Sequence, residues 1–186
     1  MTDSVTPDSF GKAYLQDAIR RFRRLKATTD KAVAQVDDQA FFAILSPEGN
    51  SIALILKHLG GNLRSRWRDF LTTDGEKPDR HRDTEFEIDE QDTREAIMAR
   101  WQAGWQYLMD ALEPLDAHDV SRTIYIRKEP HSVVQAINRQ ISHYAYHIGQ
   151  IVFLAKHFQS AEWQWLSIPP GQSEQFNAKM RRASQG

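Results

Sequence analysis

Two histidines, His143 and His147, lie four residues apart in a segment whose apolar residues follow a helical period. On a helix this spacing places both imidazole rings on one face, one turn apart, with Cβ atoms roughly 6 Å apart. Two such rings can converge on one metal ion, although helical histidines can also be hydrogen-bonded in a core or exposed. His58, on the polar edge of another predicted helix, is a candidate third ligand. Three neutral imidazoles suit zinc, nickel or iron and leave positions open for water or substrate.

Several other patterns that carry metal or nucleophile chemistry are missing from the sequence. The chain has no cysteine, which excludes disulfides, thiolate ligands and a cysteine nucleophile. It contains neither the His-Glu-x-x-His motif of zincin proteases nor the Glu-x-x-His motif of ferritin-like di-iron proteins. Because the chain has no cysteine, any thiol chemistry needs a thiol from outside the chain.

Of the other histidines, His157 lies about 15 Å along the helix from His147, which is too far to share an ion.

Four long amphipathic helices are predicted from the spacing of apolar residues. They span residues 8–36, 52–71 and 90–112, and the fourth runs from its cap at Ser132 to residue 157. In the second and fourth helices a polar, histidine-bearing edge lies beside the apolar face. Gly60 and Gly61 lie within the second helix, where each costs about 1 kcal/mol relative to alanine. We therefore expect a neighbouring helix to approach closely at these glycines.

The segments outside the four helices have different characters. Residues 72–89 are polar and are predicted to form a long loop, which in a compact domain is usually either functional or mobile. Residues 120–127 are predicted to form either a short strand or an extended linker before the fourth helix. The tail contains Trp163 and Trp165, and we expect it to pack on the body as a strap that ends in a short helix over residues 173–182.

The composition is that of an ordinary globular domain, and we expect one all-α four-helix-bundle domain over residues 1–186. Bundles commonly build metal sites from side chains on facing helices. Lysine and arginine number 24 against 25 acidic residues, so nucleic-acid binding is not expected. The one basic run, residues 20–26, is expected to be a solvated helix face with Phe22 and Leu25 turned inward. No signal peptide and no apolar run of ~20 residues is present, which predicts a cytoplasmic protein without a membrane partner.

Four stretches of the chain resemble a known family. They are residues 56–63 (LKHLGGNL), 66–77 (RWRDFLTTDGEK), 143–151 (HYAYHIGQI) and 167–173 (SIPPGQS), the last followed by Phe176 and Asn177. Together they resemble the DinB/YfiT-like superfamily and, within it, a branch catalogued as a domain of unknown function (DUF1572). The resemblance covers nearly the whole chain. It implies a four-helix bundle in which one histidine from the second helix and two from the fourth hold a divalent metal ion, which by position are His58, His143 and His147.

Other residues around the predicted ligands are candidates for supporting them or for contacting substrate. They are Asn62, Arg66, Arg127, Gln140, Tyr144 and Gln150, with Arg82 and Glu129 beside them. Asn62, one turn from His58, can orient that ring or a bound water. The two glutamines flank the histidine pair and can accept hydrogen bonds from its rings. Tyr144 leans toward the core, whereas Tyr146 leans toward solvent, and the arginines can bind an anionic substrate. The alternative is that these are ordinary polar bundle residues and exposed salt bridges.

The function we expect is that of a metal-dependent enzyme acting on a small-molecule substrate. The ion would make a nucleophile from water or from an external low-molecular-weight thiol. Characterised relatives in the superfamily include thiol-dependent S-transferases and a maleylpyruvate isomerase, which use thiols such as bacillithiol or mycothiol; hydrolysis is the other reaction expected. Two alternatives remain open. One is a non-catalytic metal-binding stress protein, either a monomer or a homodimer, and the other is a bundle whose metal site is vestigial.

Overall fold

The structure, a computed structural model, describes residues 7–183 and is mostly helical within them. Its long helices are α1 (Pro7–Val33), α3 (Ile52–Trp67), α4 (Arg94–Leu112) and α5 (Val133–Gln159). The short ones are α2 (Asp38–Phe42) and α6 (Ser173–Ala183), with single 3-10 turns at η1 (Asp83–Phe86), η2 (Asp119–Ser121) and η3 (Ser160–Glu162). The only sheet among the described residues pairs β1 (Thr123–Ile126) with β2 (Glu129–Ser132). The prediction of a mainly helical fold is therefore confirmed. Of the two alternatives for residues 120–127, the structure has the strand, over Thr123–Ile126.

Local sequence explains where the helices begin and end. Ser132 starts α5 with a capping box, in which its hydroxyl accepts from the backbone of Gln135 while the Gln135 side chain accepts from the backbone of Ser132. Thr93 caps α4, so this helix begins at Arg94, later than the predicted residue 90. The second long helix ends at Trp67, four residues earlier than predicted, because the chain turns away at Asp69 with a φ of 51°.

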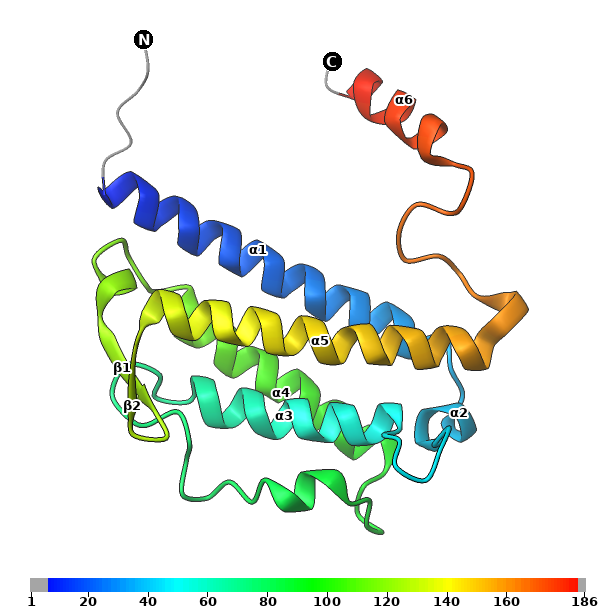
Figure 1. Ribbon diagram of the computed structural model, residues 1–186, viewed down its shortest axis with the longest axis horizontal. Helices are drawn as coiled ribbons and strands as arrows, with labels where there is room; N and C mark the ends of the chain where they lie inside the picture. Colours follow the sequence, from blue (N-terminus) through cyan, green and yellow to red (C-terminus); the bar gives the residue numbers. More distant parts are fainter. Residues whose placement is uncertain (1–6, 184–186) are drawn as a thin grey trace.

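The four long helices lie side by side, with α1 and α5 running one way and α3 and α4 the other (Figure 1). Their apolar faces meet in one core rich in aromatic rings. Phe22 packs edge-on against Trp67 with ring centroids 5.7 Å apart, and Trp101 packs against Trp105 at 5.2 Å. Phe22 is fully buried although it lies inside the basic run, and the arginines on either side of it are exposed. The expected orientation of that run is therefore confirmed.

The long loop after α3 runs back along that helix, so that η1 packs on its outer side (Figure 1). The two glycines of α3 face different neighbours. A Cβ at Gly60 would lie 3.4 Å from the backbone of Arg100 in α4, which confirms the predicted close approach of a helix. A Cβ at Gly61 would instead lie 2.7 Å from Cδ of Glu85 in η1. The absence of a side chain at Gly61 therefore makes room for this glutamate.

The tail follows the predicted strap only in its first part. Trp163 is buried, the backbone N–H of Gln164 donates to Oε1 of Gln35 at 2.7 Å, and the Lys156 ammonium lies 4.2 Å from the centre of the Trp165 ring. Beyond this point the chain leaves the body. Helix α6 extends away from the long helices (Figure 1), and none of its described residues is buried. Within residues 7–183 no helix is long and apolar enough to cross a membrane.

Candidate metal centre

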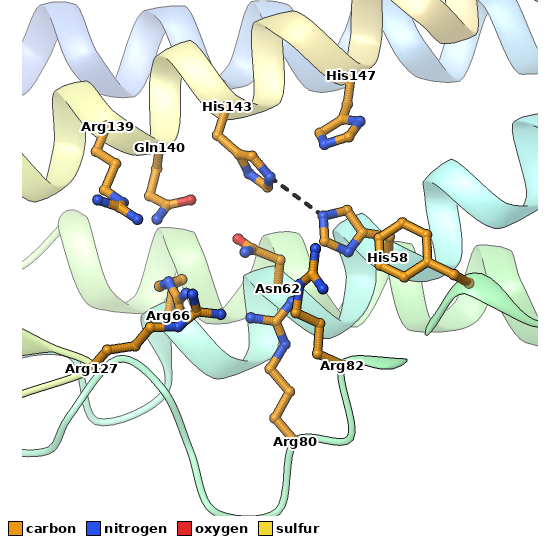
Figure 2. Close-up of a pocket in the computed structure, with 11 residues that line it drawn as sticks. His58, Asn62, Arg66, Arg80, Arg82, Arg127, Arg139, Gln140, His143 and His147 are labelled. Carbon is orange, nitrogen blue, oxygen red and sulfur yellow. Dashed lines mark hydrogen bonds between the residues drawn. The ribbon is translucent and has the colours of Figure 1, made fainter. Parts of the chain in front are cut away.

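The structure brings His58 of α3 together with His143 and His147 of α5. Ligand atoms of the three rings all lie within 4.8 Å of one another. Nε2 of His58 and Nε2 of His143 are 3.4 Å apart and point at each other, and the ring of His147 lies beside both (Figure 2). His58 is buried and the other two rings are half-buried. The three imidazoles therefore converge on one point at the edge of the core.

His58 is held in one orientation by Glu85, which sequence reasoning missed. Nδ1 of the ring lies 2.9 Å from Oε2 of Glu85, and Arg80 donates to both oxygens of this carboxylate at 2.8 Å. Burial raises the pKa of Glu85, but the hydrogen bonds from Arg80 and His58 outweigh it, so the pKa is lowered and the carboxylate is ionised at neutral pH. An ionised carboxylate only accepts hydrogen bonds. Nδ1 of His58 therefore carries the proton, and its Nε2 presents a lone pair to the other histidines.

The other two rings are neutral at pH 7. Burial, together with smaller contributions from the neighbouring His147 and His58, lowers the pKa of His143 to about 3. Burial also lowers the pKa of His147, with a smaller opposing contribution from a hydrogen bond with Gln150. A neutral imidazole is the form that binds metal. Three imidazoles, one of them oriented by a carboxylate bonded to its Nδ1, form a donor set that fits zinc, nickel or iron.

A chain of buried hydrogen bonds fixes the amide of Asn62 beside the histidines. The indole N–H of Trp67 donates to the hydroxyl of Tyr144 at 3.0 Å, and that hydroxyl donates to Oδ1 of Asn62 at 3.1 Å. Burial raises the pKa of Tyr144 to a value far above neutral, so the hydroxyl keeps its proton and remains a donor. Because Oδ1 of Asn62 is taken, its amino group is the part left to face the cavity.

The histidines form one end of a cavity of about 370 Å³, which we name the histidine–arginine cavity (Figure 2). Its lining consists of His58, Asn62, Arg66, Arg80, Arg82, Phe86, Arg127, Arg139, Gln140, His143 and His147. The rings of Phe86 and His58 have centroids 4.8 Å apart, so Phe86 covers one face of this histidine. The cavity thus joins a cluster of imidazoles to a wall of guanidinium groups, and the long loop closes one side of it.

Arg127 reaches the cavity from the turn of the β1–β2 hairpin. Arg127 and Lys128 both have positive φ, 55° and 65°, as the tight two-residue turn requires. Such a conformation costs a residue other than glycine about 1 kcal/mol or more. The carboxylate of Asp74 compensates by accepting from the backbone N–H groups of Arg127 and Lys128 at 2.8 and 2.7 Å. The loop after α3 therefore holds the hairpin and its arginine in place.

The predicted site residues divide into two groups. The three histidines, Asn62, Gln140, Arg66, Arg82 and Arg127 all line the cavity. Tyr144 does not line it and acts on it through Asn62, while Gln150 lines a separate groove. Glu129 lies in β2 outside the lining.

Sequence reasoning missed Arg80, Glu85, Phe86 and Arg139. Arg139 had a signal, because it lies one helical turn before His143 on the same face of α5. Glu85 and Arg80 had none beyond their place in a long loop, since only the folded loop brings them to α3.

Comparison with known proteins identifies the family. Residues 9–172 match the model of the family described as protein of unknown function (DUF1572), and the chain belongs to this family. The match covers the long helices except the first two residues of α1, as well as the loop, the hairpin and every lining residue of the cavity, and it ends just before α6. No curated protein and no solved structure gives a significant match.

Proposed function

We propose that this protein is a metal-dependent enzyme with a DinB-like four-helix bundle, and that His58, His143 and His147 hold a divalent zinc, nickel or iron ion. The observation that carries the proposal is the fixed ring of His58, whose Nδ1 donates to Glu85 while its Nε2 faces Nε2 of His143. Metal-binding histidines usually donate their second N–H to a carboxylate or carbonyl in this way. Two ring nitrogens at 3.4 Å inside a cluster of three imidazoles are the arrangement expected around a shared cation.

A bound divalent ion supplies Lewis-acid chemistry, which makes water or an external low-molecular-weight thiol nucleophilic at neutral pH. The residues of the chain provide position and charge. Glu85 and Arg80 fix the ring of His58, and Asn62 presents an amino group to whatever occupies the cavity. Phe86 shields one face of His58 from solvent. With no cysteine in the chain, a thiol reaction requires a thiol that enters as a substrate. The reaction classes supported are thiol transfer and hydrolysis.

A screen of small thiols, electrophiles and hydrolysable esters with metal-loaded protein tests the catalytic part of the proposal. His147→Ala removes one proposed metal ligand, whose side chain is only half-buried in α5. This substitution should abolish any activity found in the wild type. Activity that survives in His147→Ala would exclude this mechanism. Metal binding without turnover of any substrate would favour the alternative of a non-catalytic metal-binding protein.

A further inference from the structure

The histidine–arginine cavity carries more positive charge than its own carboxylates can balance. Five arginines line it, and the acidic groups that pair with them in the described structure are Glu76, Glu85 and, more loosely, the exposed Asp83. The carboxylate of Glu85 is already hydrogen-bonded to Arg80 and His58. Glu76 accepts from Arg66, Arg80 and Arg127, so one carboxylate is shared among three guanidinium groups. The protein as a whole has a formal net charge of −1, so this concentration of cations is a local property of the cavity.

Three of these arginines have donors left for a ligand. Arg139 has no hydrogen-bond or ion-pair partner among residues 7–183, and its side chain points from α5 into the cavity (Figure 2). Arg82 lies over the ring of Phe86 at 5.1 Å and has only a loose pairing of 3.8 Å with the fully exposed Asp83. Arg127 donates from its Nε to Glu76, and its two terminal nitrogens have no partner among the described residues. The three come from α5, from the loop and from the hairpin, so the fold has to assemble them.

Buried polar atoms in the same wall also lack partners. Nε of Arg66 and Oε1 of Gln140 are buried and make no hydrogen bond within the part of the chain that the structure describes. The amino group of Asn62 is turned toward the cavity by Tyr144. Buried polar groups in folded proteins are normally paired, so unpaired ones at a cavity wall indicate a polar occupant. Two of these three groups, on Arg66 and Asn62, are donors of the kind that recognise an oxyanion, and the Gln140 oxygen is an acceptor.

We infer that the histidine–arginine cavity binds a dianionic small molecule, a phosphate monoester or a dicarboxylate, with its oxyanion held by Arg82, Arg127 and Arg139. Guanidinium groups match the oxygens of phosphate and carboxylate through paired N–H donors. The inference deepens the proposed function by naming the substrate class, and it rests on that function only in placing the reacting end of the molecule at the histidines. The strained backbone of Arg127 supports it, because asparagine or glycine would adopt this turn at lower cost but would supply no cation.

Binding of inorganic phosphate and of malonate to chelator-treated, metal-free protein tests this inference by calorimetry at constant ionic strength. We expect the wild type to bind at least one of the two probes, and phosphate alone or malonate alone would identify which oxyanion the cavity prefers. Arg139→Gln and Arg82→Gln should each weaken binding about tenfold or more, as expected for loss of a charged hydrogen bond. Arg24→Gln, an exposed arginine of α1 outside the cavity, should bind as the wild type does. All three replaced side chains are exposed, and circular dichroism checks that the variants fold.

The outcomes separate this inference from the proposed metal site. Absence of phosphate and malonate binding, or equal affinity in all four proteins, would overturn the inference even if the protein holds a metal ion. Arginine-dependent binding in a protein that never takes up metal would uphold it and leave the proposed metal-dependent function without its ion.

Discussion

Glu85 accepts a hydrogen bond from Nδ1 of His58 at 2.9 Å across 27 residues of chain, and Arg80 holds the carboxylate from its other side. The loop after α3 is thereby part of the site, although its polar composition is the same as that of any exposed loop between two helices. Gly61 makes the contact possible, because a side chain there would occupy the place of the glutamate.

Replacing Glu85 by glutamine should weaken metal binding about 10- to 100-fold, the usual effect of removing a carboxylate that supports a metal-binding histidine. The amide keeps the shape of the side chain but loses the charge that fixes the proton on Nδ1 of His58. Competition with a chromophoric chelator measures the affinity. The matched control is Glu87→Gln, because Glu87 is an exposed glutamate two residues further along the same loop. Equal losses in both variants would mean that the contact with His58 is unimportant.

The two adjacent glycines of α3 give a second, independent test of the same contact. Gly61→Ala should displace Glu85 and lower metal affinity as the glutamine variant does, because the new Cβ would lie 2.7 Å from Cδ of that residue. Gly60→Ala adds a Cβ in ordinary contact range of α4, at 3.4 Å from the backbone of Arg100. It should leave metal affinity unchanged and raise the free energy of unfolding by up to ~1 kcal/mol through helix propensity. Chelator competition measures the metal affinity of both glycine variants, and urea unfolding measures their stability. A loss of metal affinity in Gly60→Ala but not in Gly61→Ala would refute the placement of η1 against Gly61.

Two tyrosines on α5 test the buried hydrogen-bond chain. Tyr144→Phe removes the hydroxyl between Trp67 and Asn62 and leaves both without this partner in the core. We expect the free energy of unfolding to fall by about 1–3 kcal/mol, the cost of unpaired buried polar groups. Tyr146→Phe should change it by less than ~0.5 kcal/mol, because that side chain is 66% exposed. Urea denaturation measures both variants, and a Tyr144→Phe protein as stable as Tyr146→Phe would show that the chain does not form.

Asp74 predicts a pH dependence of stability. Burial raises the pKa of this carboxyl, but hydrogen bonds from the backbone N–H groups of Glu76, Lys128 and Arg127 outweigh it, so the folded pKa is lowered. The unfolded chain has the ordinary value near 3.9 and binds more protons as the pH falls. The contribution of Asp74 is therefore complete above about pH 5 and is lost as the pH falls through the folded pKa.

Asp74→Asn measures this contribution directly. We expect the variant to be about 1–3 kcal/mol less stable than the wild type at pH 7, with the difference shrinking below about pH 4. Denaturation by urea at several pH values gives both quantities. A difference that stays constant from pH 7 to pH 3 would mean that the charge of Asp74 does not hold the hairpin turn.

The sequence predicted those parts of the fold that depend on local patterns. The helices of His58 and of His143 and His147 follow from apolar spacing and, for α5, from the cap at Ser132. A helical angle alone placed Tyr144 inward and Tyr146 outward. Residues 120–127 were left open between a strand and a linker, and the pairing of β1 with β2 was not predicted. Neither strand has a strong signal, because β1 has four residues and β2 contains Pro130.

Contacts made by the loop could not be predicted from local patterns. Arg80 and Glu85 reach α3 only after residues 68–93 have folded back along it, and no spacing rule relates them to His58. The tail was over-predicted, because two tryptophans suggested packing along its whole length. Only Trp163 is buried, while Trp165 remains 45% exposed.

Elemental analysis of protein purified without a histidine tag, after growth with zinc, nickel and iron supplied, tests the central claim most directly. The account predicts close to one divalent ion per chain in the wild type, and loss of that ion in His58→Ala and His147→Ala, because a site with three convergent ligands stays largely occupied. Replacement of His157, which lies outside the cluster, should leave the metal content unchanged. Less than ~0.2 ion per chain in the wild type, or a content unaffected by loss of His58, would contradict it.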